Sequence, residues 1–149
     1  MPRDAMPPRE LVELTDRLAR KSGVFHIREH PYILKTGACG QEEMRDALDA
    51  LSGELWPCVW LHGDLAPWNC LMSTDGHLRL IDWEYAEEFG LPHVDLAYYA
   101  LQVSYFVRRA DPHQALRLAT AALEPRTSTR LVAEALTRVA CYGAYTQEI

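Results

Sequence analysis

The sequence lacks a long apolar run, an excess of basic residues and closely spaced cysteines, and each absence excludes a class of protein. No stretch approaches the 18 apolar residues of a membrane span and no apolar leader stands at the N-terminus, so we expect neither membrane insertion nor export. The 15 lysines and arginines are outnumbered by 21 aspartates and glutamates, and the net charge of −6 argues against a nucleic-acid binder. The four cysteines form no C-x-x-C pair, which favours reduced thiols and a cytoplasmic location.

The spacing of apolar residues, prolines and glycines predicts a mainly helical chain with one small β-hairpin, an α+β fold. The apolar residues 58–61 predict a short buried strand. Cys70–Met72 and Leu78–Ile81 are short apolar runs on either side of Asp75-Gly76, a strong hairpin signal. Helices are expected at about residues 8–22, 41–52, 94–109, 112–123 and 128–145, and a short extended piece at 32–34.

Three polar residues near the predicted hairpin can carry chemistry together. Asp64 and Asn69 lie on the loop after the predicted strand, and Asp82 ends the second strand of the hairpin, which returns it to that loop. Phosphoryl transfer requires an acceptor hydroxyl held in line and a hard cation that neutralises the phosphates. One aspartate can take the hydroxyl proton, while a second aspartate and an asparagine supply oxygen ligands to Mg²⁺. We therefore predict that these three residues form one site.

In this order, the residues resemble the catalytic loop and metal-binding segment of the aminoglycoside phosphotransferase and choline kinase family, whose fold is related to that of protein kinases. The family pattern H-G-D-x-x-x-x-N, followed after a hairpin by I-D-W/F-E/D, is present at residues 62–69 and 81–84. The resemblance implies that Asp64 is the catalytic base, and that Asn69 and Asp82 bind Mg²⁺ and thereby the nucleotide. It also implies ATP, or another nucleoside triphosphate, as the donor and a small-molecule hydroxyl as the acceptor.

The resemblance gives supporting roles to further residues. His62 and Gly63 would shape the catalytic loop. Asp95 resembles the aspartate of the family element G-x-x-x-x-D-L-A, which braces that loop from the next helix. Glu84 is compatible both with a role near the metal or substrate and with a solvated start of the next loop. The acceptor stays open among aminoglycosides, choline-like cations and neutral small molecules.

The resemblance covers only the C-terminal catalytic lobe of such a kinase. The sequence has no G-x-G-x-x-G segment, and one of its two lysines, Lys35, faintly resembles a nucleotide-binding lysine on a strand. We interpret residues 1–149 as one C-lobe whose N-terminal lobe is absent or supplied by a partner chain. Its parts are leading helices at 1–56, the catalytic loop and metal-binding hairpin at 57–84, and a helical substrate-side subdomain at 85–149.

Two other functions stay open at this point. A truncated or non-catalytic kinase-like interaction module would keep the shape of the lobe without its activity. A metal-dependent phosphohydrolase could use the same aspartates and asparagine, although a two-metal site requires additional histidine and aspartate ligands.

Overall fold

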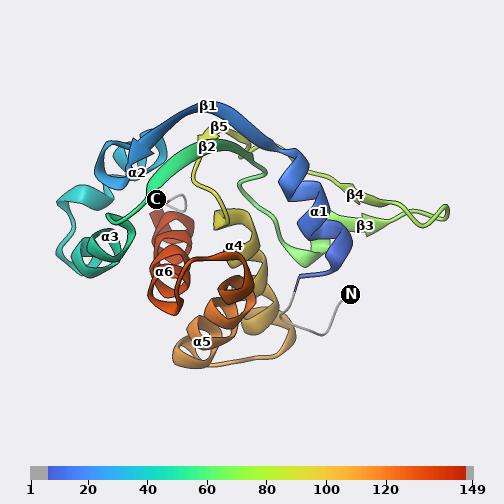
Figure 1. The fold of residues 1–149 in the computed structure, drawn as a ribbon. Coiled ribbons are helices and arrows are strands. Elements are labelled where there is room, and N and C mark those ends of the chain that lie inside the picture. Colours follow the sequence, from blue (N-terminus) through green and yellow to red (C-terminus); the bar gives the residue numbers. More distant parts are fainter. Residues whose placement is uncertain (1–6, 147–149) are drawn as a thin grey trace.

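A computed structural model describes residues 7–146, and Figure 1 shows a small antiparallel sheet arching over a layer of helices. The sheet consists of β1 (Ala19–His26), β2 (Leu55–Leu61) and β5 (Glu87–Gly90), with β2 in the centre. Helices α4 (Val94–Gln102), α5 (Pro112–Leu123) and α6 (Arg130–Thr146) lie beneath it. The fold is therefore mixed α and β, and it contains a three-stranded sheet that the sequence analysis did not predict.

Residues 1–56 were predicted to be leading helices, and the first of these, expected at about residues 8–22, is wrong for its second half. Helix α1 (Arg9–Arg17) ends well before Gly23, and the chain continues as β1. This strand is stabilised by pairing with β2, where Phe25 lies opposite Trp56 and His26 opposite Leu55. Backbone hydrogen bonds to a distant strand override the local leucine spacing on which the longer helix was predicted.

Residues 32–34 are helical rather than extended, because they belong to α2 (Pro31–Thr36). Pro31 occupies the first turn, where its missing N–H is not needed. The ring nitrogen Nδ1 of His30 caps the helix by accepting a hydrogen bond from the N–H of Tyr32 at 3.2 Å. The predicted helix at 41–52 is present as α3 (Arg45–Leu51) with a preceding short turn. The short 3₁₀ turns here are η1 (Ile27–Glu29), η2 (Ala38–Gly40) and η3 (Glu42–Met44).

The predicted strand and hairpin are present, although the strand is only partly buried, since Trp60 is exposed. Residues 58–61 form the end of β2, and a 3₁₀ turn η4 (Pro67–Asn69) leads into β3 (Cys70–Met72). Strand β4 (Leu78–Leu80) pairs with β3 in antiparallel register, with Cys70 opposite Leu80. The hairpin extends away from the body of the molecule, on the right in Figure 1.

The helical layer of the C-terminal half is also confirmed. Helix α4 packs against α5 and α6, and α6 packs against α3. Asp111 begins α5 with a capping box, since its side chain accepts from the N–H of Gln114 and the Gln114 side chain accepts from its N–H. A π-helical turn η5 (Val103–Val107) follows α4, and a 3₁₀ turn η6 (Glu124–Arg126) precedes α6. Large, fully buried core side chains of this layer are Leu96, Tyr99, Leu123 and Leu136.

The ends of the predicted 1–149 domain, residues 1–6 and 147–149, lie outside the described residues. Within the described part, no helix combines the length and the hydropathy that crossing a membrane requires.

Candidate active site

Pairing between β2 and β5 brings the two halves of the candidate site together. Strand β2 runs directly into His62, Gly63 and Asp64, and β5 leads through a short turn into α4, which carries Asp95. The two strands are antiparallel, with Leu61 opposite Glu87. The loop after β2 and the first turn of α4 therefore lie against each other.

Asp95 holds this loop through its backbone. Its Oδ2 accepts a hydrogen bond from the N–H of His62 at 2.7 Å, and its Oδ1 accepts one from the N–H of Gly63 at 3.1 Å. Only 4% of the Asp95 surface is exposed. Burial raises the pKa of the Asp95 carboxyl, while the two backbone donors act in the opposite direction. The predicted bracing role thus has the contacts that it requires.

Gly63 is required by the shape of the loop. Its φ of +86° lies in the left-handed region, and a Cβ atom at this position would collide with the backbone carbonyl of Tyr85. The two backbone segments approach each other so closely that no side chain fits between them, which explains the glycine of the H-G-D motif.

The imidazole of His62 joins the loop to the end of the hairpin. Its Nε2 lies 2.8 Å from the carbonyl oxygen of Ile81 and its Nδ1 accepts from the N–H of Asp64 at 3.3 Å. Nε2 must therefore be the protonated nitrogen, because a carbonyl can only accept. The ring is fully buried and contacts the indole of Trp83, with 4.6 Å between ring centroids. His62 thus fixes Asp64 relative to the segment that carries Asp82.

The carboxylate of Asp64 receives donors from two different elements. Its Oδ2 accepts from Nδ2 of Asn69 at 3.1 Å, and its Oδ1 accepts from the hydroxyl of Tyr98 at 2.9 Å. Nδ2 of Asn69 also donates to the backbone oxygen of Asp64 at 2.9 Å. Tyr98 was not among the residues predicted from the sequence, although its position three residues after Asp95 on the same helix places the two side chains on one helix face.

Asp82 lies at the edge of this arrangement. The N–H of Ile81 donates to the backbone oxygen of Asn69 at 3.0 Å, so the hairpin places residues 81 and 82 beside Asn69. Asp82 itself is exposed and has a φ of +64°. Aspartate tolerates this left-handed conformation better than most residues. The structure thus joins Asp64 to Asn69 by a hydrogen bond and places the backbone of Asp82 next to Asn69, and a site shared by all three residues stays a prediction.

The oxygen donors fit Mg²⁺. Among residues 7–146, no group of three or more histidine, cysteine, aspartate or glutamate side chains could hold a metal ion. Mg²⁺ does not need such a cage, because it keeps several waters and is commonly bound by one or two carboxylates together with substrate phosphates. Asp82 supplies a carboxylate and Asn69 an amide oxygen, since the Asn69 nitrogen is committed to Asp64. Carboxylate and amide oxygens of this kind suit a hard cation that is also held by phosphates.

Glu84 and Lys35 are two further charged residues that the sequence suggested, and both are exposed. Glu84 is exposed, which is compatible with either of its two predicted interpretations. Lys35 lies on α2 rather than on a strand, and its ammonium group forms an ion pair with Glu87. The faint resemblance of Lys35 to a nucleotide-binding lysine on a strand is therefore wrong, because Pro31 and the His30 cap begin a helix there.

Comparison with known proteins agrees with this arrangement. A family model described as the phosphotransferase enzyme family matches residues 7–134. The match includes the loop after β2, the hairpin and the whole of α4 and α5. Searches of curated proteins and of solved structures gave no significant match.

Proposed function

The chain belongs to the phosphotransferase enzyme family, and we propose that it carries the catalytic machinery of an ATP-dependent small-molecule kinase. In this proposal, the γ-phosphate of ATP or another nucleoside triphosphate passes to a hydroxyl group of a small acceptor, such as an aminoglycoside or a choline-like alcohol. The observation that carries the proposal is the Asp64 carboxylate, which is held by Asn69 from its own loop and by Tyr98 from α4.

Asp64 is proposed to be the general base. A general base must lie within hydrogen-bond reach of the proton it takes, and such catalysis typically contributes about 10²–10⁴-fold to the rate. An ionised carboxylate oxygen has two lone-pair sites, so Oδ1 and Oδ2 can each accept one further hydrogen bond. The side chain of Asp64 is only half-buried, which leaves room for an acceptor hydroxyl to approach it.

Asn69 and Asp82 are proposed to hold Mg²⁺ together with the phosphates of the nucleotide. When bound, the ion would neutralise charge on the transferred phosphoryl group. Two hydrogen bonds from Nδ2 of Asn69 to Asp64 fix the orientation of the amide, so Oδ1 of Asn69 is the ligand atom. A base and a metal ligand that contact each other keep a constant relative position, which phosphoryl transfer requires.

Further residues are proposed to support the reaction without taking part in it. Asp95, His62 and Gly63 hold the loop, and Glu84, an exposed residue two positions after Asp82, is proposed to act near the metal or the acceptor. The described cysteines are all free thiols, in keeping with the reducing cytoplasm as the proposed location.

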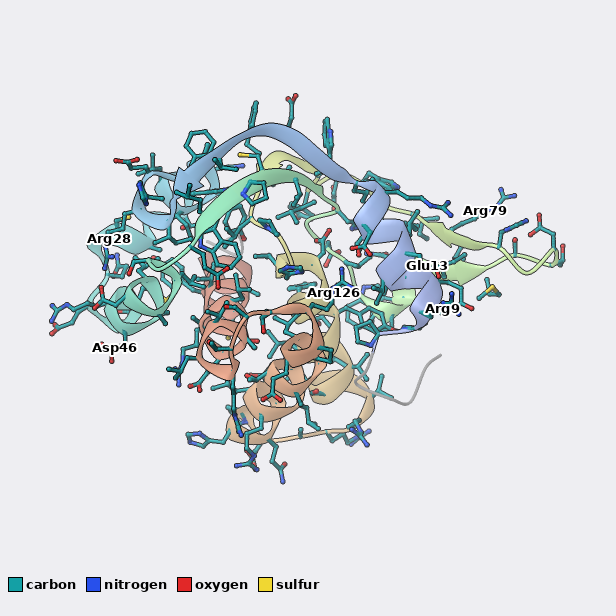
Figure 2. The ribbon with its side chains drawn as sticks, viewed as in Figure 1. Arg9, Glu13, Arg28, Asp46, Arg79 and Arg126 are labelled. Carbon is teal, nitrogen blue, oxygen red and sulfur yellow. The ribbon has the colours of Figure 1, made fainter. Side chains whose placement is uncertain are left out.

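The proposal is tested by titrating Mg²⁺-ATP calorimetrically and then measuring phosphate transfer to choline, kanamycin and a neutral hexose. We expect the wild-type chain to bind the nucleotide and to transfer phosphate to one acceptor class, and D64N to bind equally well but to lose transfer. D46N is a matched control, because Asp46 is exposed on α3, across the molecule from the hairpin residue Arg79 in Figure 2.

Two results would contradict the proposal. Lack of nucleotide affinity, with the chain alone and with candidate partner chains, would favour a non-catalytic interaction module. Release of phosphate from a phosphomonoester without ATP would favour a phosphohydrolase instead.

A further inference from the structure

We propose that Tyr98 is a positioning residue of the phosphotransfer site, and that its hydroxyl fixes the Asp64 oxygen that receives the acceptor proton. The hydroxyl donates to Oδ1 of Asp64 at 2.9 Å. The inference rests on the proposed function, because it gives Tyr98 a role in catalysis through Asp64 as the base.

The two oxygens of the Asp64 carboxylate have different partners. Oδ2 accepts from Asn69, which is part of the same loop and also contacts the Asp64 backbone. Oδ1 accepts from Tyr98, which stands on α4. The terminal torsion of an aspartate is broad, so the Asn69 contact alone would leave the carboxylate free to rotate. A second donor from a separate element fixes the plane of the carboxylate and thus the direction of the remaining lone pair on Oδ1.

Helix α4 is well suited to this role. Asp95 and Tyr98 are three residues apart, so they lie on the same face of the helix. Both line a small hollow with Gly63, whose volume is about 20 Å³. Most of α4 is buried against α5 and α6, which makes it a rigid support. One helix therefore holds the backbone of the catalytic loop through Asp95 and its carboxylate through Tyr98.

The neighbouring Tyr99 provides a contrast on the same helix. It is fully buried, and its hydroxyl has no hydrogen-bond partner among the described residues. Tyr99 lines a different cavity, together with Cys70 and Leu78. A change of tyrosine to phenylalanine removes one hydroxyl at either position, but only at Tyr98 does it remove a contact with Asp64.

The test compares Y98F, Y99F, D64N and the double variant Y98F/D64N in Mg²⁺-ATP turnover, with choline or kanamycin as the acceptor. We expect Y98F to lower kcat about tenfold, because a misoriented base loses part of its contribution. KM for ATP should stay within about twofold, because Tyr98 is not proposed to contact the nucleotide. Y99F should keep the wild-type kcat. In the D64N background, Y98F should cause no additional loss.

The outcomes separate this inference from the proposed function. If D64N is impaired while Y98F turns over like the wild type, Tyr98 has no positioning role and the proposed function stands. If Y98F lowers kcat by the same factor with and without Asp64, its effect is a general structural one and the inference is overturned. If D64N is as active as the wild type, or if neither the wild type nor any variant transfers phosphate, the proposed function and the role of Tyr98 both fail. Urea unfolding of each variant shows whether a loss of kcat reflects a loss of folded protein.

Discussion

Oδ2 of Asp95 accepts a hydrogen bond from the backbone N–H of His62 at 2.7 Å, although the two residues are 33 positions apart in the sequence. Asp95 stands in the first turn of α4 and His62 follows β2, so this bond joins the helical layer to the catalytic loop. The same carboxylate also binds the N–H of Gly63. The backbone position of the first two residues of the loop, His62 and Gly63, therefore depends on the buried side chain of Asp95.

Replacing Asp95 by alanine is expected to destabilise the fold by about 3 kcal/mol, because buried N–H groups lose their acceptors. D111A is the matched control, since Asp111 accepts one backbone hydrogen bond at an exposed helix start. Loss of such a cap typically lowers the free energy of unfolding by about 1 kcal/mol. Urea unfolding monitored by circular dichroism measures both values. An equal or smaller loss in D95A would mean that Asp95 does not brace the loop.

Gly63 and Gly76 have nearly the same backbone conformation, with φ of +86° and +82°, but different surroundings. A Cβ atom at Gly63 would collide with Tyr85, whereas a Cβ atom at Gly76 would meet nothing within 4 Å. Both alanine variants should pay the left-handed penalty of about 1–2 kcal/mol. We expect G63A to lose roughly 1–3 kcal/mol more than G76A, because the backbone must shift to relieve the collision. Similar unfolding free energies for the two variants would contradict the close approach of Tyr85.

The proposed metal role of Asp82 predicts a change in Mg²⁺ dependence. D82N removes one negative charge but preserves the backbone, because asparagine also tolerates a positive φ. We expect the Mg²⁺ concentration for half-maximal ATP binding to rise roughly tenfold or more. D75N is the control, because Asp75 is an exposed residue at the tip of the same hairpin. An unchanged Mg²⁺ requirement in D82N, measured by calorimetry, would remove Asp82 from the metal site.

The burial of His30 leads us to predict that the protein loses stability in mild acid. Burial lowers the pKa of His30, and its Nδ1 must be unprotonated to cap α2. At pH values between this lowered pKa and the pKa of about 6.5 in the unfolded chain, the unfolded chain binds more protons than the folded chain. The free energy of unfolding should therefore reach its full value when the pH is above the pKa of the unfolded state. It should fall as the pH drops below that pKa.

H30N isolates this effect, because asparagine is a good helix cap that does not titrate in this range. The other histidines are the same in both proteins, including His93, whose pKa is also lowered by burial. We expect the stability of H30N to depend less on pH between 7.5 and 5.5 than that of the wild type. Equal slopes in urea unfolding would show that the protonation of His30 is not linked to folding.

The hairpin and the helices of the C-terminal half were predicted correctly from local signals in the sequence. The Asp75-Gly76 turn between two apolar runs predicted the hairpin, and the helix expected at residues 112–123 is present as α5. Asp64 and Asn69 were expected to lie close together on one loop, and they are hydrogen-bonded to each other. Short-range hydrogen bonds decide these features, so a single sequence contains the information.

Elements that depend on distant partners were missed. Strand β1 exists through its pairing with β2, and β5 through Leu61 opposite Glu87, a residue with no local preference for a strand. Helix α2 begins with a histidine cap, which is not a usual N-terminal signal. Tyr98 was missed because its contact with Asp64 bridges 34 residues. For β1, β5 and Tyr98, the tertiary fold supplies the deciding interaction, whereas the cap of α2 is local but of an unusual residue type.

The most direct test of the central claim is the single-turnover rate of phosphate transfer from saturating Mg²⁺-ATP, compared between the wild type and D64N. If Asp64 is the general base, D64N should bind the nucleotide with unchanged affinity, and its transfer rate should fall about 10²–10⁴-fold. A D64N protein that transfers phosphate at the wild-type rate would contradict the assignment of Asp64, and with it the proposed catalytic site.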